Sequence, residues 1–351
     1  MAPVVDALRR RPGVFTVVLC TTGQHREMLD QVQELFGLVP DLDLRLMRHD
    51  QTLNGLAAAA LGTMDEVLVS TRPDWLLVQG DTTTAMAAAV AAFHRGVRVG
   101  HVEAGLRTGD LRRPFPEEAN RRLIDQLGEA LFAPTLRARS ALLAEGLAAE
   151  KVHVVGNTVI DALQAIAPDS WERPDRDEVL ITVHRRESFG EPVRGIFSAL
   201  RRLAESFPDV LWIYPVHRNP HVHAPAFEIL SGAPNLRLCE PLSYRELVRH
   251  LQRCRFVLTD SGGIQEEAPT FGKPVLVLRE KTERPEGIEA GVARLVGVDP
   301  ERIFAEAARL LRSEEAYREM ACAINPYGDG HAGERIAAIL AGEPWAPFTS
   351  A

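Results

Sequence analysis

The sequence lacks several features that would assign it to a specialised class of protein. Its 351 residues include only four cysteines, Cys20, Cys239, Cys254 and Cys322, which are too far apart for a metal-ligand pair or a dense disulfide framework. No apolar run approaches the ~18 residues that cross a bilayer, and the N-terminus lacks the apolar core of a signal peptide. We therefore expect reduced thiols, no membrane partner and a cytoplasmic location.

Basic residues are fewer than acidic ones. Forty Lys and Arg residues face 48 Asp and Glu residues, which gives a net charge of -8 and an isoelectric point near 5.8. An acidic protein repels nucleic acid and anionic membranes, so neither is expected as the main partner. A local basic site for a small anion is compatible with this charge. The sequence has no internal repeat and no low-complexity tract.

The length indicates two domains, because a single hydrophobic core stops growing at roughly 250–300 residues. After a helix at residues 1–11, strand-like and helix-like segments alternate, which predicts α/β domains with parallel sheets. The predicted strands are 14–20, 42–47, 75–79, 97–102, 130–133, 152–155, 179–182, 210–214, 236–239, 256–259 and 274–278. Residues 168–177 carry two prolines and several charges and predict a linker. The predicted domains are 1–167 and 178–330, with a helix and tail at 331–351 that packs back on the first domain.

The stretch from Gly100 to Arg122, GHVEAGLRTGDLRRPFPEEANRR, concentrates candidate catalytic groups. Glu103 follows an apolar strand, and ligands of open α/β sheets bind beyond the carboxyl ends of the strands. A helix is predicted to begin near Pro116. In this helix Glu117 and Arg121 are four residues apart and share a face. An exposed ion pair is the alternative, but the preceding strand and glycine-rich loop favour a functional site.

Asp81 has the same position after the predicted strand 75–79. It could cap the Ala-rich helix that follows, because an Asp at that position satisfies unpaired backbone N–H groups. It could also act as an acid in the same layer as Glu103. The two roles do not exclude each other, and the sequence leaves both open.

Candidate anion-binding groups gather in the second half. Ser261–Gly263 follow a predicted strand and open a helix, where small residues let backbone N–H groups approach a phosphate. His184 also follows a strand and precedes Arg185; a single histidine is more often structural than catalytic, so both readings stay open. His217 has the same position after the next strand. Neither histidine has neighbours at metal-ligand spacing, so no metal site is expected.

Nine segments occur in order along the chain: QGDTTTAMAAAVAAF, GHVEAGLRTGD, PFPEEANR, GNTVIDAL, HRRESFG, TDSGGIQEEAP, GKPVLVLRE, TERPEG and NPYGDG. Together they resemble the non-hydrolysing bacterial UDP-N-acetylglucosamine 2-epimerases, from Met1 to about Ala341. Nine ordered segments agree by chance far more rarely than any one motif. The resemblance implies two Rossmann-like domains around a central cleft, which is a glycosyltransferase-B-like fold, and a homodimer.

The resemblance also implies a reaction without nicotinamide or metal. UDP is eliminated as the C2 proton is removed, and it then adds back to the bound 2-acetamidoglucal with a proton delivered to the opposite face. The product is UDP-N-acetylmannosamine for cell-envelope polysaccharide. Two alternatives stay open: a hydrolysing 2-epimerase that releases UDP and N-acetylmannosamine, and an inactive UDP-sugar-binding protein.

Matching these motifs position by position implies roles for individual residues. The catalytic set is Asp81, Glu103, Glu117, Arg121 and His184. The set that binds UDP and substrate is Arg185, Ser261, Gly262, Gly263, Glu267 and Arg284. An activating site for a second UDP-N-acetylglucosamine is implied at Gln24, Glu27, Arg185 and His217. The resemblance does not assign the carboxylate that removes the C2 proton.

The chain departs from the family pattern at its start. Family members begin with a short strand and a GTRPE-type turn, whereas this chain begins at the helix that follows them. The missing strand is central in a Rossmann half, so its neighbouring strands are expected to lack partners. Each buried backbone group left without a hydrogen bond is expected to lower the stability by roughly 1–3 kcal/mol. A start codon placed too late or a truncated chain would explain the departure, and low stability and weak activity are expected.

Overall fold

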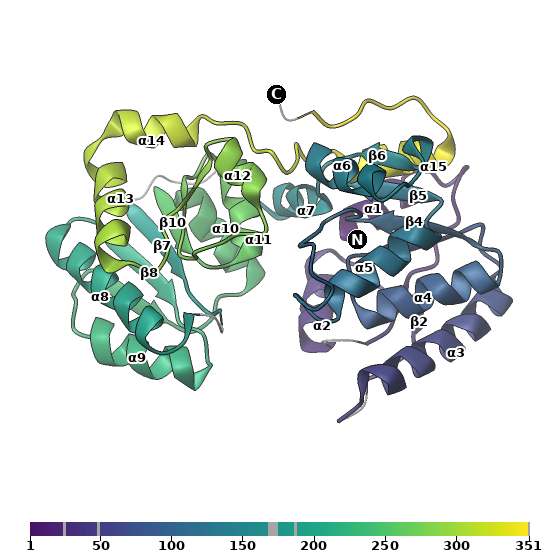
Figure 1. Cartoon of the computed structure of the whole chain (residues 1–351), viewed down its shortest axis with the longest axis horizontal. Coiled ribbons are helices and arrows are strands. Elements are labelled where there is room, and N and C mark those ends of the chain that lie inside the picture. The colour runs from purple at the N-terminus through teal and green to yellow at the C-terminus, as the bar shows by residue number, and fades with distance from the viewer. Residues whose placement is uncertain (24–25, 48–49, 168–174, 186–187, 350–351) are drawn as a thin grey trace. The chain divides into compact units, whose positions relative to one another are not determined.

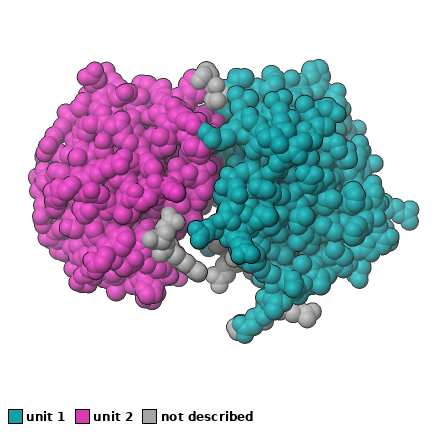
Figure 2. Space-filling view, viewed as in Figure 1, with its two compact units in different colours: residues 1–162, 328–349 teal, residues 163–327, 350–351 magenta. Residues whose placement is uncertain are grey.

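The computed structural model describes residues 1–23, 26–47, 50–167, 175–185 and 188–349. The chain forms two compact units, which Figure 2 shows in different colours. Unit 1 comprises Met1–Ala162 and Gly328–Thr349, and unit 2 includes Leu163–Tyr327. Within the described ranges, no helix has the length and apolar character that a membrane span requires.

Unit 1 is built from helices and short parallel strands (Figure 1). Its strands are β1 (Cys20–Thr21), β2 (Leu42–Asp43), β3 (Trp75–Gln79), β4 (Arg98–Val102), β5 (Ala130–Ala133) and β6 (Val152–Val154). Its helices are α1 (Ala2–Arg9), α2 (Arg26–Leu35), α3 (Leu53–Thr71), α4 (Thr83–His94), α5 (Glu117–Leu127), α6 (Leu136–Ala144) and α15 (Ala332–Ala341). Helix α7 (Thr158–Ile166) leads from unit 1 into unit 2.

The strands of unit 1 form two separate parallel sheets. One has the order β3-β4-β5-β6, and the other consists of β1 and β2. In the described part of the chain β1 pairs only with β2 and β3 pairs only with β4, so each presents an unpaired edge.

The first predicted strand is mostly wrong. Residues 14–19 join no ladder, and the side chains of Val14 and Val18 are exposed. The end of this segment approaches β2: the Leu19 carbonyl accepts the N–H groups of Asp41 and Leu42 at 2.8 and 3.1 Å. A strand needs a neighbour along its whole length, and β2 supplies one for two residues.

The core of unit 1 joins both ends of the chain. Val4, Ala7 and Leu8 of α1 share an apolar cluster with Phe132 of β5 and Ile336 of α15. The two helices approach closely at Gly333, where a Cβ atom would lie 2.8 Å from the carbonyl oxygen of Pro3. The C-terminal helix therefore packs on the N-terminal one through a position that requires glycine.

Unit 2 contains a six-stranded parallel sheet of order β12-β11-β10-β7-β8-β9. The strands are β7 (Glu178–Thr182), β8 (Leu211–Pro215), β9 (Leu236–Cys239), β10 (Phe256–Thr259), β11 (Val275–Val277) and β12 (Ala293–Leu295). The helices are α8 (Glu191–Ser206), α9 (Pro220–Leu230), α10 (Tyr244–Arg253), α11 (Gly262–Glu267), α12 (Pro285–Glu289), α13 (Pro300–Arg312) and α14 (Glu314–Ala321). The predicted class, an α/β protein with parallel sheets, is confirmed, whereas β12 is not among the predicted strands.

The sheet of unit 2 is buried on both faces. In β7, Val179 and Ile181 belong to one apolar cluster and Leu180 to another. Successive side chains of a strand point to opposite faces, so the two clusters lie on the two sides of the sheet. Such a strand reads as a continuous apolar run, which is why the sequence predicts β7 and β10 well.

Two glycines of the stretch from Gly100 to Arg122, in unit 1, test how closely the loop after β4 packs against α6. Gly105 and Gly109 have similar left-handed φ angles of 84° and 83°. A Cβ on Gly105 would collide with the carbonyl oxygen of Ala138 and lie 2.8 Å from Cγ of Leu142, whereas one on Gly109 would meet nothing within 4 Å.

We expect Gly109→Ala to lower the free energy of unfolding by about 1–2 kcal/mol, the cost of a left-handed L-residue. Gly105→Ala should cost clearly more, because α6 must also move away. Urea denaturation followed by circular dichroism measures both variants. Equal losses would contradict the close approach of the Gly105 loop to α6.

Candidate active site

Two candidate acids of unit 1 emerge at the same edge of its sheet. Strands β3 and β4 are parallel, with Gln79 in register with Val102, so Asp81 and Glu103 follow neighbouring strand ends. The N–H of Gly80 donates to the Val102 carbonyl at 3.1 Å. A Cβ built on Gly80 would lie 3.9 Å from Oε2 of Glu103, so the Glu103 carboxylate reaches over the end of β3.

Glu103 has an unusual backbone conformation. Its φ is 68°, in the left-handed region, which costs about 1–2 kcal/mol for a residue with a side chain. Strain of this kind clusters at functional sites, where the surrounding structure holds it in place. The strained backbone therefore supports the prediction from sequence that Glu103 belongs to a site.

Asp81 does not cap helix α4, so the capping role that the sequence left open is wrong. Thr82 is the N-cap residue, and its hydroxyl accepts the N–H of Ala85 at 3.1 Å. The Asp81 carboxylate instead forms an ion pair with Nη2 of Arg121. Its backbone carbonyl accepts from the side chain of Asn120 at 2.9 Å. Both contacts come from α5, so α5 fixes the end of β3.

Arg121 is buried, which excludes the exposed Glu117–Arg121 pair that was the alternative from sequence. Its Nη1 donates to the carbonyl of Leu106 at 3.1 Å and to Oε2 of Glu118 at 3.3 Å. The guanidinium thus connects the Leu106 loop, α5 and Asp81. Glu117 begins α5, and its Oε2 is buried with no hydrogen-bond donor in the described structure. A buried acceptor without a donor is costly and marks a place for a ligand group.

Glu118 holds the candidate site together, and sequence reasoning did not single it out. It is fully buried and accepts the N–H groups of Thr108 and Gly109 at 3.1 and 3.4 Å, together with the guanidinium groups of Arg121 and Arg122. It therefore holds the glycine-rich loop against α5. The motif PFPEEANR contains two adjacent glutamates, and the helical spacing of three or four from Arg121 fits either one.

In unit 2 the candidates lie where the strand order reverses. The chain runs outward through β7, β8 and β9, then crosses back to β10 beside β7. Ligands of open α/β sheets bind beyond the carboxyl ends of the strands at such a switch point. His184 follows β7 and Ser261 follows β10, so the fold brings these two predicted segments together.

Asp260 organises this switch point and was also missed from sequence. It is fully buried, and its Oδ2 accepts the backbone N–H groups of His184 and Arg185, both at 2.8 Å. Its Oδ1 lies 3.1 Å from Nδ1 of His184, an ion-pair distance without hydrogen-bond geometry. The signal in the sequence is its position directly after the apolar strand β10, the position that singled out Asp81 and Glu103.

His184 is held mostly in its neutral form. Burial lowers its pKa, the Asp260 carboxylate raises it, and the charges of Arg185 and His217 lower it again, with a net shift downward. The ring of His217 stacks on that of His184, with centroids 5.9 Å apart. The imidazole of His184 is therefore available for proton transfer near neutral pH.

The predicted anion-binding turn includes a close approach of an arginine. Ser261 is the N-cap residue of the short helix α11 and does not use its hydroxyl for capping. A Cβ on Gly262 would lie 3.2 Å from the guanidinium carbon of Arg284, so glycine lets the cation approach the backbone. Nε of Arg284 donates to Oε1 of Glu266 at 2.7 Å. The turn thus combines backbone N–H groups with a cation.

Glu267 lies at the end of α11 and is buried. Its pKa is raised to about 6, chiefly by burial and against the hydrogen bond that the Tyr244 hydroxyl donates to its Oε1 at 3.1 Å. A buried carboxylate that retains accepting capacity suits a ligand with hydroxyl groups. Tyr244, which directs the carboxylate, is a further residue that the sequence did not indicate.

The structure groups the predicted residues within their own units. Unit 1 holds Asp81, Glu103, Glu117 and Arg121, and unit 2 holds His184, Arg185, His217, Ser261, Gly262, Gly263, Glu267 and Arg284. Gln24 lies outside the described residues, and Glu27 belongs to α2, where its side chain is not described. In the ranges that the structure covers, no three His, Cys, Asp or Glu side chains are placed to hold a metal ion.

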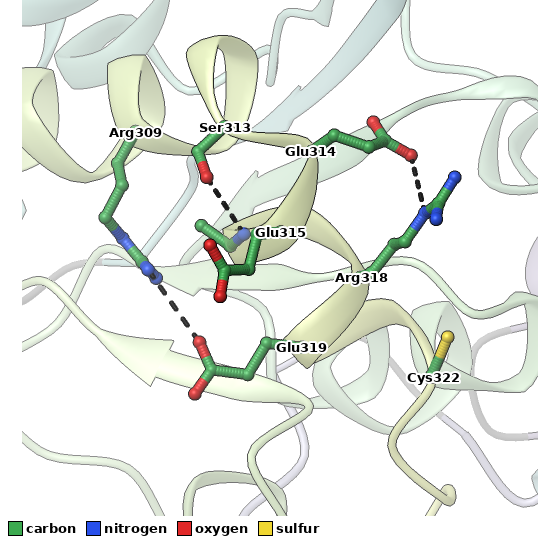
Figure 3. A pocket seen from close by; sticks show the side chains of 8 residues that line it. Arg309, Ser313, Glu314, Glu315, Arg318, Glu319 and Cys322 are labelled. Carbon is green, nitrogen blue, oxygen red and sulfur yellow. Dashed lines mark hydrogen bonds and ion pairs between the residues drawn. The ribbon is translucent and has the colours of Figure 1, made fainter.

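A cavity of about 1000 Å³ lies elsewhere on unit 2, along α13 and α14 (Figure 3). It is lined by Arg309, Ser313, Glu314, Glu315, Ala316, Arg318, Glu319 and Cys322. Charged side chains there pair with one another, as Arg318 does with Glu314 at 3.0 Å. None of the predicted site residues lines this cavity.

Comparison with known proteins identifies the family. The family described as UDP-N-acetylglucosamine 2-epimerase matches residues 6–341. The UDP-N-acetylglucosamine 2-epimerase of Bacillus subtilis is 46% identical over 342 residues, which cover 96% of this chain and 90% of the relative. The crystal structure of the Neisseria meningitidis enzyme bound to UDP-GlcNAc has a TM-score of 0.88 and 42% identity, over 98% of this chain and 96% of that one.

A glycotransferase of kitacinnamycin shares the fold at 13% identity, with a TM-score of 0.63 over 97% of this chain and 93% of its own. This likeness confirms the predicted glycosyltransferase-B-like fold class. The matches to the family span almost the whole chain, including both groups of candidate residues. The chain therefore belongs to the UDP-N-acetylglucosamine 2-epimerase family.

Proposed function

We propose that the chain catalyses the reversible epimerisation of UDP-N-acetylglucosamine to UDP-N-acetylmannosamine at C2 of the sugar. Family membership supports this reaction, and a solved relative is described as bound to UDP-GlcNAc. The observation that carries the proposal is the pair of carboxylates, Asp81 and Glu103, at adjoining strand ends. Inversion of a carbon requires proton-transferring groups that serve its two faces.

The proposed reaction has two half-steps and no net oxidation. In the first, a carboxylate takes the C2 proton, the C–H electron pair forms the C1=C2 double bond, and the C1–O bond breaks with its electrons leaving on UDP. In the second, a phosphate oxygen of UDP adds to C1 of the 2-acetamidoglucal, and a proton reaches C2 from the opposite face. One group must act as a base and another as an acid.

The residues of unit 1 are proposed to carry out the proton transfers. Arg121 holds the Asp81 carboxylate from the side of α5, and the left-handed backbone of Glu103 directs its carboxylate over Gly80. Glu117 offers a buried oxygen that accepts no hydrogen bond in the described structure. Arg121 acts as a positioning residue, and the three carboxylates are the candidates for acid and base.

The residues of unit 2 are proposed to bind UDP and stabilise it as it leaves. Departure of UDP increases the negative charge on the β-phosphate, and oriented donors lower the energy of that state. Ser261–Gly263 supply backbone N–H groups, and Arg185 and Arg284 supply cations. His184, with its lowered pKa, can exchange a proton with the leaving oxygen. Glu267 is proposed to accept hydrogen bonds from the ribose hydroxyl groups.

We also propose activation by a second UDP-N-acetylglucosamine at Gln24, Glu27, Arg185 and His217. The stacking of His217 on His184 supports this, because a ligand at His217 would alter the surroundings of a candidate catalytic group. We expect the initial rate to rise sigmoidally with UDP-N-acetylglucosamine and His217→Ala to reduce the cooperativity. A hyperbolic curve that Gln24→Ala leaves unchanged would contradict activation.

The principal test of the function is proton NMR of the chain with UDP-N-acetylglucosamine in D2O. We expect deuterium to enter at C2 while UDP-N-acetylmannosamine accumulates, because each elimination exchanges the C2 proton with solvent. Accumulation of free N-acetylmannosamine would identify a hydrolysing enzyme instead. Saturable UDP binding without exchange would identify an inactive binding protein.

A matched pair of variants shows whether the measured activity belongs to the proposed site. Glu103→Gln should slow C2 exchange by about 100-fold or more, the usual contribution of a general acid or base, while UDP still binds. Glu129→Gln is the control, because Glu129 is exposed and pairs with Lys151 at 3.2 Å on the surface. Equal rates in the two variants would exclude Glu103 from the chemistry.

Glu267 gives a prediction of pH-dependent stability. Its pKa is about 6 in the folded chain against an ordinary 4.5, so folding favours the protonated carboxyl group. This contribution is complete below pH 4.5 and is lost as the pH rises through about 6. Glu267→Gln removes the charge that destabilises the fold at high pH. It should therefore raise the free energy of unfolding by about 2 kcal/mol at about pH 8 and change it little at acidic pH. Urea denaturation checks this, and a pH-independent difference would refute it.

A further inference from the structure

His101, in the middle of the stretch GHVEAG, is buried and has an acceptor at each ring nitrogen. Nδ1 lies 2.6 Å from Oδ1 of Asp125, and Nε2 lies 2.8 Å from the carbonyl oxygen of Gly80. The side chains of His101 and Asp125 are both inaccessible to solvent. No water can therefore replace either partner, and the imidazole must satisfy both contacts itself.

The number of donors determines the protonation state of this ring. A carbonyl oxygen only accepts, and an ionised carboxylate only accepts, whereas neutral imidazole has a single N–H. The other oxygen of Asp125 accepts from Nη2 of Arg107 at 2.7 Å, and a guanidinium only donates, so this oxygen carries no proton. Two hydrogen bonds to two acceptors then require both ring nitrogens to carry protons.

The charged groups around His101 form a defined set. Asp125 comes from α5, Arg107 from the loop after β4, and Glu145, which pairs with Arg107 at 2.7 Å, from the end of α6. The cross-strand neighbours of His101, Val78 of β3 and Leu131 of β5, are apolar. Asp125 is thus the charged group in direct contact with the ring among the described residues.

His101 links the two strand ends that carry the candidate acids. Gly80 donates its N–H to the Val102 carbonyl at 3.1 Å and accepts from His101 through its own carbonyl, so both of its backbone groups are tied to β4. Asp81 follows Gly80 directly, and Glu103 lies two residues after His101 on the same strand end. A shift of the ring would therefore move one acid relative to the other.

We propose that His101 is a buried imidazolium, held by Asp125, that acts as a positioning residue for Asp81 and Glu103. This inference rests on the proposed function, because positioning matters only if these acids perform the chemistry. The ring itself lies below the strand ends, without access to solvent, and takes no part in proton transfer with the substrate.

The protonation state is tested in the wild-type chain without any assay of activity. Protein labelled with ¹⁵N-histidine is examined near neutral pH by long-range ¹⁵N–¹H correlation. Among the 11 histidines, the signal that disappears in His101→Gln should show two protonated ring nitrogens. A pattern with one protonated and one bare nitrogen would overturn the proposal, and Asp125→Asn should convert the ring to that neutral pattern.

The positioning role is tested by steady-state kinetics. His101→Gln and Asp125→Asn should each lower kcat by about 100-fold, the scale expected for misplacing a catalytic group by about 1 Å, with KM changed much less. The control is His250→Gln, which breaks a partly buried contact of a histidine with a carboxylate, 2.6 Å from Glu178 in unit 2. Its kcat should equal that of the wild type.

The outcomes separate the inference from the proposed function. A wild-type chain without C2 exchange would refute the proposed function, and the NMR pattern would still decide the charge on His101. An active wild type in which Asp125→Asn stays folded and keeps its kcat within about twofold would overturn the positioning role. If His101→Gln fails to fold, Asp125→Asn preserves the volume of the site and supplies the same readouts.

Discussion

The pairing of buried charges fixes the geometry of unit 1. Glu118 and Asp125 are fully buried, and Arg121 nearly so, and a buried charge is tolerated only when other groups satisfy it. The described contacts form two series of paired side chains that start at Glu145. One passes through Arg107 and Asp125 to His101 and Gly80, and the other through Arg122, Glu118 and Arg121 to Asp81. Both series end at the carboxyl end of β3, so α5 and the glycine-rich loop determine where Asp81 lies.

Unit 2 holds its candidate residues in place in a different way. Its sheet is apolar on both faces, and its polar groups gather at the switch point between β7 and β10. There the carboxylate of Asp260 binds two consecutive backbone N–H groups, which fixes the turn that carries His184 and Arg185. Hydrogen bonds from backbone N–H groups to one buried side chain hold His184 and Arg185. The position of His184 therefore depends on β7 and β10 staying in register.

The sequence predicts features that depend on local pattern. Strands buried on both faces, such as β7 and β10, are recognisable as apolar runs, and acids at strand ends stand out by position. Residues 14–19 show the same apolar pattern but join no ladder, because pairing depends on a neighbour that pattern does not reveal. Helical spacing likewise cannot distinguish Glu117 from Glu118 as the partner of Arg121. Asp260 and His101 act through contacts with distant segments, and one sequence does not show such contacts.

The candidate site retains features that a structure optimised for stability would lack. Glu103 has a strained backbone, Glu267 has a raised pKa, and Glu117 has a buried oxygen without a donor in the described structure. All three are carboxylates, to which a ligand with hydroxyl and amide groups could donate hydrogen bonds. On the proposed function, a UDP-sugar would compensate these costs on binding. The rigid pairing around Arg121 and Asp260 then has a clear physical role: it keeps the candidate residues in place before a ligand binds.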